Sequence, residues 1–403
     1  MVDTNAILVG PEGTPFTITP GSAHTAFRQA LDHLAGLSTN GGDLYVLPGT
    51  SKYVFGQKVV VGTGAPDLGV DNLTIHFSKG AILDFDPNAS LDALFEVRRR
   101  GFRCIGAHVQ HQSGNVTDRS CFLINDNGVA GASNDASFID CTFDMEQAGN
   151  QIRAFSCIRA VGTGTAALLR RGLDVNRCVF LFRPGVRQRF GWPTLDPYGI
   201  CAVRGRDSAE FTITGCQFRA HPFAGGGVGM CGPAIYLDQC DESVVSSCVF
   251  SSLDLKPVPG PQPASLLTLI RLRTQVSEAH HSILSANVFR AIEAETWIDL
   301  LDPQFEAVTG NVFGRPGSTA KWIVAAHPAN PPSSNANTLV LVGNAFSDDP
   351  ASPAEMVRLE SIANVVAEGN VLSDLSPGKR GFVVEADCSN VEVSPNQARG
   401  TSD

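Results

Sequence analysis

One stretch rich in arginine and aromatic residues, residues 183–198, has the side chains best suited to binding a ligand. Trp and Tyr rings stack on sugar rings, and an Arg guanidinium pairs with a carboxylate or sulfate through two parallel hydrogen bonds. The candidate carbohydrate-binding residues in it are Arg187, Arg189, Trp192 and Tyr198. In the alternative interpretation, these aromatic rings cover the body of the protein or pack on a neighbouring subunit.

A second candidate site lies in short strand-like segments at residues 235–238, 270–273 and 298–300. Alternate side chains of a strand point to opposite faces, so an inward Ile at the start of each segment leaves the next residue outward. The expected outward columns are Tyr236, Arg271 and Asp299 and, beside them, Asp238 and Arg273. Such residues form either surface ion pairs or, with Trp297 and Trp322 nearby, a carbohydrate groove.

Catalysis would need a different arrangement. Glycosidases place two carboxyl groups either roughly 5 Å or roughly 6.5–9.5 Å apart across the bond they cleave. Acidic residues that could form such a pair are Asp238, Asp241, Glu242 and Asp299, and also Asp140, Asp144 and Glu146. Acidic residues are common enough that this match is near chance. The cysteines lie too far apart for metal-ligand spacing, so we expect neither a metal nor another cofactor.

A repeated motif determines the expected fold. It consists of an apolar residue, two spacers, Cys or Asn, one spacer, and an apolar residue that is usually Phe. The Cys or Asn positions are Cys141, Cys178, Cys216, Cys248, Asn287, Asn311, Asn344 and Asn370, with degraded copies at Ala107 and Asn396. Successive copies lie 24 to 39 residues apart. A fixed motif with variable spacing is typical of constant coils joined by loops of different length.

Within the motif the pattern is that of a bent strand. Phe211, Ile213, Cys216 and Phe218 alternate with polar residues except for one break at Gly215. Period-two alternation indicates a strand with one buried face, and the break indicates a corner. A second strand precedes each motif. We therefore predict an all-β fold, a right-handed parallel β-helix of about ten coils spaced about 4.8 Å apart. Cys or Asn, and the Phe after it, would then stack in columns.

Composition limits the possible partners and compartments. The chain has 403 residues and a net charge of −10, which disfavours nucleic acid and anionic membranes but not acidic glycans bound at a local basic cluster. Its 11 cysteines are an odd number, and those at repeat positions are expected to be buried thiols. No stretch reaches transmembrane length and no leader is evident. We expect synthesis in the cytoplasm and release by another route, such as cell lysis.

The N-terminal region carries the most specific resemblance. Residues 25–34 form an amphipathic pattern typical of a short capping helix, residues 41–50 read Gly-Gly-Asp-Leu-Tyr-Val-Leu-Pro-Gly-Thr, and a Tyr-Val-Phe strand follows. This opening resembles pectate-lyase-like β-helix proteins, and is most similar to bacteriophage tailspikes and related spikes of phage-like particles. The resemblance covers about residues 20–398. The expected organisation is a docking segment at 1–20, capping helix and first strands at 21–60, β-helix at 61–398 and a tail at 399–403.

The resemblance implies a homotrimer. Many relatives carry a Gly-Asp-Gly-x-x-Asp-Asp-Thr stretch before the helix, whereas this chain has Thr-Pro-Phe-Thr-Ile-Thr-Pro-Gly there, so residues 1–20 could dock to another particle protein. The paired-Asp, His-Gly and Arg-Ile-Lys motifs of related polygalacturonases are absent from the sequence. An evident Asp cluster for calcium, as in pectate lyases, is absent too.

Three functional hypotheses follow. The first is a spike or fibre on the surface of a phage or phage-like particle that binds host capsular polysaccharide for attachment. The second is a polysaccharide depolymerase, a hydrolase or lyase, on the same scaffold. The third, a free-standing pectinase-like enzyme, is disfavoured by the missing leader.

Overall fold

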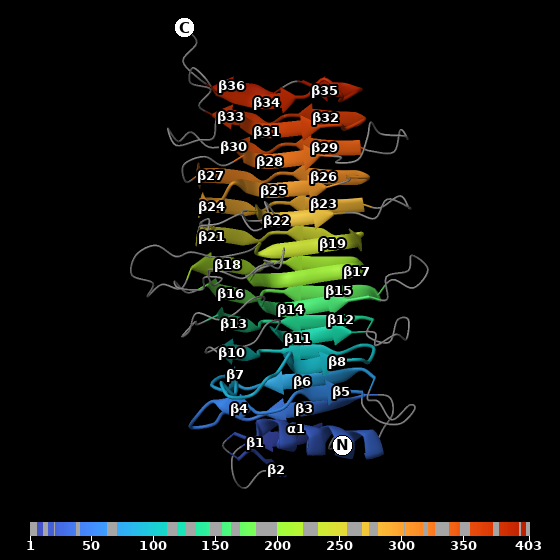
Figure 1. Cartoon of the computed structure of the whole chain (residues 1–403), viewed down its shortest axis with the longest axis vertical. Helices are drawn as coiled ribbons and strands as arrows, with labels where there is room; N and C mark the ends of the chain where they lie inside the picture. The colour runs from blue at the N-terminus through green and yellow to red at the C-terminus, as the bar shows by residue number, and fades with distance from the viewer. Residues whose placement is uncertain are drawn as a thin grey trace.

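The computed structural model shows coils stacked along one axis, from an N-terminal helix to the C-terminal strands (Figure 1). The structure describes residues 6–10, 15–19, 21–37, 41–62, 71–110, 119–125, 134–145, 155–162, 170–182, 200–220, 233–255, 268–273, 281–301, 303–316, 321–326, 338–346, 355–373, 379–394 and 396–399. In this part of the chain, no helix is long and apolar enough to cross a membrane.

The strands form three stacks. The first stack holds β5 (Val59–Val61), β8 (Ala93–Val97), β11 (Arg119–Asn125), β14 (Phe155–Val161), β17 (Ile200–Thr214), β19 (Ile235–Asp241), β22 (Thr268–Arg273), β25 (Thr296–Leu301), β28 (Lys321–Ala326), β31 (Glu355–Glu360) and β34 (Arg380–Val384). The second holds β1 (Ala6–Gly10), β3 (Gly42–Val46), β6 (Leu73–Phe77), β9 (Arg103–Ile105), β12 (Ala136–Ile139), β15 (Arg170–Asn176), β20 (Val244–Ser246), β23 (His281–Ser285), β26 (Phe305–Thr309), β29 (Thr338–Val342), β32 (Asn364–Glu368) and β35 (Val391–Val393), with β2 (Phe16–Thr17) paired to β1. The third holds β4 (Tyr53–Phe55), β7 (Ile82–Phe85), β10 (His108–Gln110), β13 (Thr142–Met145), β16 (Val179–Phe182), β18 (Gln217–Ala220), β21 (Val249–Asp254), β24 (Val288–Glu293), β27 (Val312–Pro316), β30 (Ala345–Phe346), β33 (Val371–Ser373) and β36 (Gln397–Arg399).

Each strand pairs in parallel with the strand of the same stack one coil away. Examples are β19 with β22, β23 with β26 and β24 with β27. The long strand β17 runs through the first and second stacks and pairs with β14 and β19 in one and with β15 and β20 in the other. This topology confirms the predicted right-handed parallel β-helix.

A helix closes the N-terminal end of the core. Helix α1 (Ala23–Leu37) contains the predicted helical segment and buries one face, with Phe27, Ala30 and Leu34 fully covered. The Phe27 ring lies 5.5 Å from that of Phe55 and 5.3 Å from that of Phe95. Below the helix, β1 pairs with β3, so part of the expected N-terminal docking segment belongs to the solenoid.

The Asn positions form a continuous hydrogen-bonded ladder at the corner between the second and third stacks. Asn287 Nδ2 donates to Asn311 Oδ1 at 3.0 Å, and its backbone N–H donates to the same oxygen at 2.9 Å. The same pair of bonds joins Asn311 to Asn344, Asn344 to Asn370 and Asn370 to Asn396. Each side-chain amide thus hydrogen-bonds to backbone groups at the bend, which lie inside the core and have no partner in a neighbouring strand.

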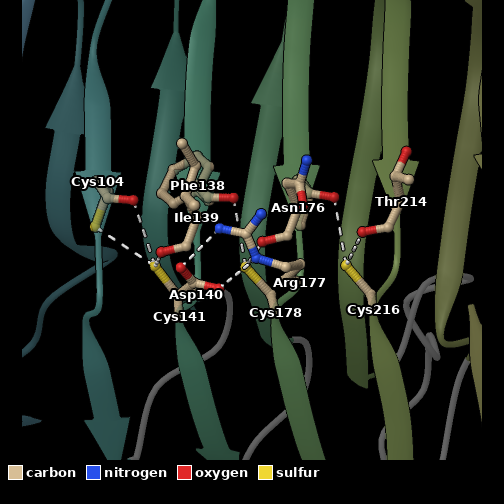
Figure 2. A network of polar contacts seen from close by, with 11 residues as sticks. Cys104, Phe138, Ile139, Asp140, Cys141, Asn176, Arg177, Cys178, Thr214 and Cys216 are labelled. Carbon is tan, nitrogen blue, oxygen red and sulfur yellow. Dashed lines mark hydrogen bonds and ion pairs between the residues drawn. The ribbon is translucent and has the colours of Figure 1, made fainter.

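The Cys positions occupy the same slot. Asn311 Nδ2 also donates to the carbonyl of Leu284 on β23, one coil earlier. The thiols of Cys178 and Cys216 donate to the equivalent carbonyls of Phe138 and Val175. Figure 2 shows this thiol column at the bend between the two stacks. A small buried thiol therefore replaces the amide at the corner with a weaker bond to the same carbonyl column.

The cysteines are buried thiols, as the sequence predicted. Ten are described, all free, and only Cys388 among them is partly exposed. Burial raises the pKa of the Cys104 and Cys240 thiols well above the ordinary value, so these groups stay protonated.

The motif phenylalanines stack as expected along the third stack. From Phe143 to Phe346, successive ring centroids are 4.6–5.1 Å apart and the rings are within about 10° of parallel. This spacing equals the rise between coils, about 4.8 Å. The phenylalanine column therefore fixes the register of neighbouring coils together with the Asn and Cys ladder.

The ladder predicts that removing an Asn side chain destabilises the fold more than removing a Cys side chain does. Asn311→Ala would leave the Leu284 carbonyl and the Asn287 N–H without their side-chain partner, and each buried unsatisfied group costs about 1–3 kcal/mol. We expect Asn311→Ala to lower the free energy of unfolding by roughly 2–4 kcal/mol. Cys216→Ala should lower it by only about 1 kcal/mol, since a thiol is a weak donor. Urea unfolding of both variants would measure this, and equal losses would contradict the ladder's role.

A buried carboxyl group predicts a pH effect on stability. Glu306 on β26 is 1% exposed, its Oε2 has no hydrogen-bond partner, and burial raises the pKa of its carboxyl group well above the ordinary value. A raised folded-state pKa means that wild-type stability falls as pH rises from about 4.5 through that pKa. Glu306→Gln removes this loss.

We expect thermal melting to show Glu306→Gln and wild type nearly equal at pH 4, with the variant more stable at pH 8. The polar neighbours of the Glu306 carboxyl group are the backbone N–H of Gln304, which bonds to it, and Ser282 on the adjacent strand. Both residues stay as in wild type in this experiment. A stability difference that does not vary with pH would contradict the assignment.

Candidate functional site

An outward column of arginine and tyrosine side chains runs up the first stack. Parallel register places Arg159 of β14 beside Arg204 of β17, and Arg204 beside Tyr236 of β19. Tyr236 in turn lies beside Arg271 of β22, and Arg271 beside Asp299 of β25. The strand alternation turns these side chains away from the core while neighbours such as Val203 and Ile270 fill it. We call these five residues the arginine column.

The arginine column is partly shielded from water. Arg204 is 6% exposed and Tyr236 is 7% exposed. The Arg271 guanidinium lies 6.0 Å from the Tyr236 ring centroid and 3.5 Å from the Asp299 carboxylate. Burial raises the pKa of Asp299, and the charge of Arg271 opposes that shift. Positive groups in a shielded site interact more strongly with a bound anion than they would in bulk water.

A second outward row runs beside the arginine column. Arg206, Asp238 and Arg273 are register partners on β17, β19 and β22. Arg273 lies 3.6 Å from Asp238, and Arg206 lies 3.3 Å from Asp207. Burial raises the pKa of Asp207, with the Arg206 charge opposing and the Asp238 charge reinforcing the shift. These pairs balance charge locally within the second row.

Around the corner of β17, a groove of about 430 Å³ lies over the second stack. Its charged lining consists of Arg103 on β9, Asp135 before β12, Asp174 on β15 and Glu210 within β17. Ser137 and Thr212 add hydroxyl groups. Gly172, at φ +71°, makes room for Asp135, because a Cβ there would lie 2.8 Å from Asp135 Oδ1. We call this feature the acidic groove.

Asp174 stands in the middle of the acidic groove. Parallel register puts Ser137 on one side of it and Thr212 on the other. Its Oδ1 is buried without a hydrogen-bond partner, and burial raises the pKa of its carboxyl group. A carboxyl group with a raised pKa that lines a groove with other acidic residues is suited to general acid catalysis.

The structure sorts the predicted binding residues into two groups. Arg187, Arg189, Trp192 and Tyr198 lie outside the described residues. Tyr236, Asp238, Arg271 and Asp299 lie in the two outward rows, at the register that the sequence predicted. Their role in binding carbohydrate stays a prediction.

The expectation that tryptophans line this face is wrong. Trp297 and Trp322 are fully buried and pack in the core against Phe313. Trp297 and Ile298 are consecutive buried residues at the start of β25, where the chain enters the coil. This local break in alternation turns the indole inward.

The acidic residues that could form a carboxyl pair differ in their surroundings. Asp241 is buried and Glu242 is exposed, while Glu146 lies outside the described residues. Asp140 is held by Arg177 through bonds of 2.8 and 2.9 Å at the exposed corner (Figure 2). The acidic groove is lined by Asp135, Asp174 and Glu210, for which the sequence carries no motif signal. In the described part of the chain, no group of three His, Cys, Asp or Glu side chains is arranged to hold a metal ion.

No family model matches the chain, and no curated protein matches it. Among solved structures, the surface adhesin PfbA of Streptococcus pneumoniae is similar at 11% identity and a TM-score of 0.38, over 87% of this chain and 88% of that one. The tailspike of Escherichia coli bacteriophage HK620, in complex with a pentasaccharide, is similar at 13% identity and a TM-score of 0.39, over 92% and 64%. The AlgE4 A-module of Azotobacter vinelandii, a mannuronan C-5 epimerase, is similar at 10% identity and a TM-score of 0.31, over 96% of this chain and 100% of that one. Because these identities and TM-scores are low, the fold is assigned from the strand register described above.

Proposed function

We propose that this protein is a spike or fibre of a phage or phage-like particle that binds an anionic host cell-surface polysaccharide, such as a capsule, for attachment. Its place is on the surface of the particle. The arginine column is the contact surface. The observation that carries the proposal is the continuous register of Arg159, Arg204, Tyr236 and Arg271 on adjacent strands.

Geometry supports a polymer lying along the solenoid axis. Adjacent strands are about 4.8 Å apart, so the arginine column presents one side chain per coil at a regular interval. A polysaccharide with repeated carboxylate or sulfate groups can engage several guanidinium groups at once, and the Tyr236 ring packs beside the Arg271 guanidinium within the column. The chain as a whole carries a net charge of −10, so a local row of basic residues is needed to attract such a polymer.

Attachment to the particle is the second part of the proposal. The docking element is the N-terminal segment, and the assembled spike is a homotrimer. Val9 of β1 is fully buried and β1 pairs with β3, so deletion of all 20 residues would damage the solenoid end. Removal of residues 1–5 is the cleaner variant: loss of particle incorporation with an unchanged melting temperature supports docking, and normal incorporation refutes it.

Charge removal in the arginine column tests glycan binding. We expect Arg271→Gln to weaken binding of an anionic capsular polysaccharide about tenfold, because a hydrogen bond to a charged group contributes about 1.5–3 kcal/mol. Arg290→Gln, which removes the same charge from an exposed position on β24, is the matched control and should bind as wild type does.

Glycan-array binding followed by calorimetry would measure both affinities. Wild-type binding should also fall as salt rises, since the contacts are ionic. Equal affinities of the two variants, or no binding of any anionic glycan by wild type, would contradict the proposed site.

The acidic groove favours a second function, a polysaccharide depolymerase. Asp174, with its raised pKa, would protonate the leaving glycosidic oxygen, and Asp135 or Glu210 would act as base or nucleophile. The hydroxyl groups of Ser137 and Thr212 would bond to the sugar. Such an enzyme would use the arginine column to hold the polymer and the acidic groove around the corner of β17 to cleave it.

Replacement of Asp174 separates binding from cleavage. If the depolymerase hypothesis holds, Asp174→Asn should reduce chain shortening at least a hundredfold while polysaccharide affinity stays within twofold. Glu242→Gln, an exposed carboxyl outside the acidic groove, is the control and should cleave normally. Size-exclusion chromatography of digested polysaccharide would show the result. Unchanged chain length with wild-type protein would refute the depolymerase hypothesis and leave the attachment function.

A further inference from the structure

An exposed pair of stacked rings lies on the second stack, near its N-terminal end. The Tyr45 ring on β3 stacks on the His76 ring on β6, with 4.6 Å between the ring centroids and 8° between the ring planes. Tyr45 is 40% exposed. The other Trp and Tyr side chains in the described residues are buried, namely Tyr53, Tyr236, Trp297 and Trp322. We call Tyr45 and His76 the ring pair.

The ring pair is held in one orientation. His76 Nε2 lies 2.8 Å from Asp43 Oδ1, and these two side chains are 31% and 33% exposed. The stacking and this hydrogen bond fix both rings before a ligand arrives, so little side-chain entropy is lost on binding. A rigid aromatic surface with a polar edge suits a sugar, whose C–H groups pack on the ring while its hydroxyl groups bond to the polar atoms.

The ring pair lies in the same two outward rows of side chains as the acidic groove. One row consists of the register partners Asp43, Thr74, Arg103, Ser137, Asp174 and Thr212. The other consists of Leu8, Tyr45, His76, Ile105, Ile139 and Asn176. Figure 1 shows β15, β12, β6 and β3 of these rows stacked in this order toward the N-terminal helix. The acidic groove ends at Arg103, so the ring pair continues its path by two coils.

The dimensions of the two rows fit one polymer chain. From Thr212 to Asp43, five steps of about 4.8 Å give about 24 Å, and two outward residues per strand make the rows about 10 Å wide. The resulting area of ~240 Å² is far below the ~800 Å² per partner of a standard protein interface. A single polysaccharide chain that lies along the solenoid axis needs only such a strip.

The side chains around the ring pair limit the kind of sugar. Leu8 and Ile105, its neighbours along the row, are apolar. The Asp43 carboxylate, which is bonded to His76, would repel a uronic acid or a sulfated sugar at this position. An uncharged pyranose ring avoids this repulsion, in contrast to the acidic sugars expected on the arginine column.

We propose that the ring pair is a subsite for an uncharged pyranose unit, in a glycan chain that runs along the second stack from the acidic groove toward the N-terminal helix. The inference rests on the proposed function only in taking a glycan as the ligand. It adds a binding surface on a different stack from the arginine column and with different chemistry. Its contacts are apolar and hydrogen-bonded, so binding there should not weaken with salt as binding to the arginine column does.

Removal of the Tyr45 ring tests the subsite. Calorimetry would use uncharged glucose, galactose and mannose oligosaccharides of graded length, at low and at high salt. We expect wild-type protein to bind at least one series, with an affinity that rises with chain length and changes less than about twofold with salt. Tyr45→Ala should weaken this binding about tenfold at an unchanged melting temperature, whereas Tyr45→Phe, which keeps the ring, should stay within about threefold of wild type.

Phe305→Ala is the matched control. Phe305 on β26 is 44% exposed, and its ring also contacts a histidine ring, that of His281, at 4.9 Å between centroids. It lies on the same stack but outside the two rows, so this variant should bind as wild type does. No binding of any uncharged series by wild type, or equal affinities of Tyr45→Ala and Phe305→Ala, would overturn the proposal.

The same variants separate this inference from the proposed function. If Arg271→Gln binds anionic polysaccharide normally while Tyr45→Ala loses the uncharged glycan, the ring pair stands and the arginine column is wrong. If Arg271→Gln loses the anionic polysaccharide and Tyr45→Ala binds every glycan normally, the ring pair is wrong and the attachment function stands. A Tyr45→Ala protein that binds glycan normally but is missing from assembled particles would assign the ring pair to a protein contact and overturn the proposal.

Fluorescence gives a second measurement at the same place. Leu8→Trp sets an indole beside Tyr45, at a position that is 40% exposed. Saturating uncharged oligosaccharide should shift the emission of this variant more than that of wild type, whose described tryptophans are buried. An emission shift no larger than that of wild type would overturn the proposal.

Discussion

The corner between the second and third stacks imposes the constraint on which the rest of the structure depends. There the chain bends inside the core, and its backbone N–H and C=O groups leave the strand ladder where no water can reach them. Asn287, Asn311, Asn344 and Asn370 satisfy these groups and bond to one another, so each coil is aligned with the next. Toward the N-terminus the thiols of Cys178 and Cys216 bond to the same carbonyl column more weakly.

Once the corners are aligned, every outward position becomes part of a column with a spacing of about 4.8 Å. The core needs only inward positions, so the outward ones can differ from one height to another. This chain displays two surfaces in that way: the arginine column on the first stack and the acidic groove around β17 on the second.

Electrostatics varies sharply among these surfaces despite the overall charge of −10. Arg204 is shielded from water, which would strengthen its interaction with a bound anion, whereas the pair of Arg177 and Asp140 is exposed and contributes little to stability. Burial acts on the acids in the opposite sense. It raises the pKa of Asp174 in the acidic groove and of Glu306 inside the core, so the charged form of each is less favoured than it would be in water.

The sequence by itself determined the fold and the ladder, because period-two alternation and the bend at each Cys or Asn are local signals. It also placed Tyr236, Arg271 and Asp299 in one column, since each follows an inward Ile in a similar segment. Only the tertiary structure added Arg159 and Arg204, because loops of different length separate the strands and hide their register from the sequence. The acidic groove was likewise decided at corners, where left-handed residues such as Asp135 and Glu210 break the alternation, and the inward turn of Trp297 by two consecutive buried residues at the start of β25.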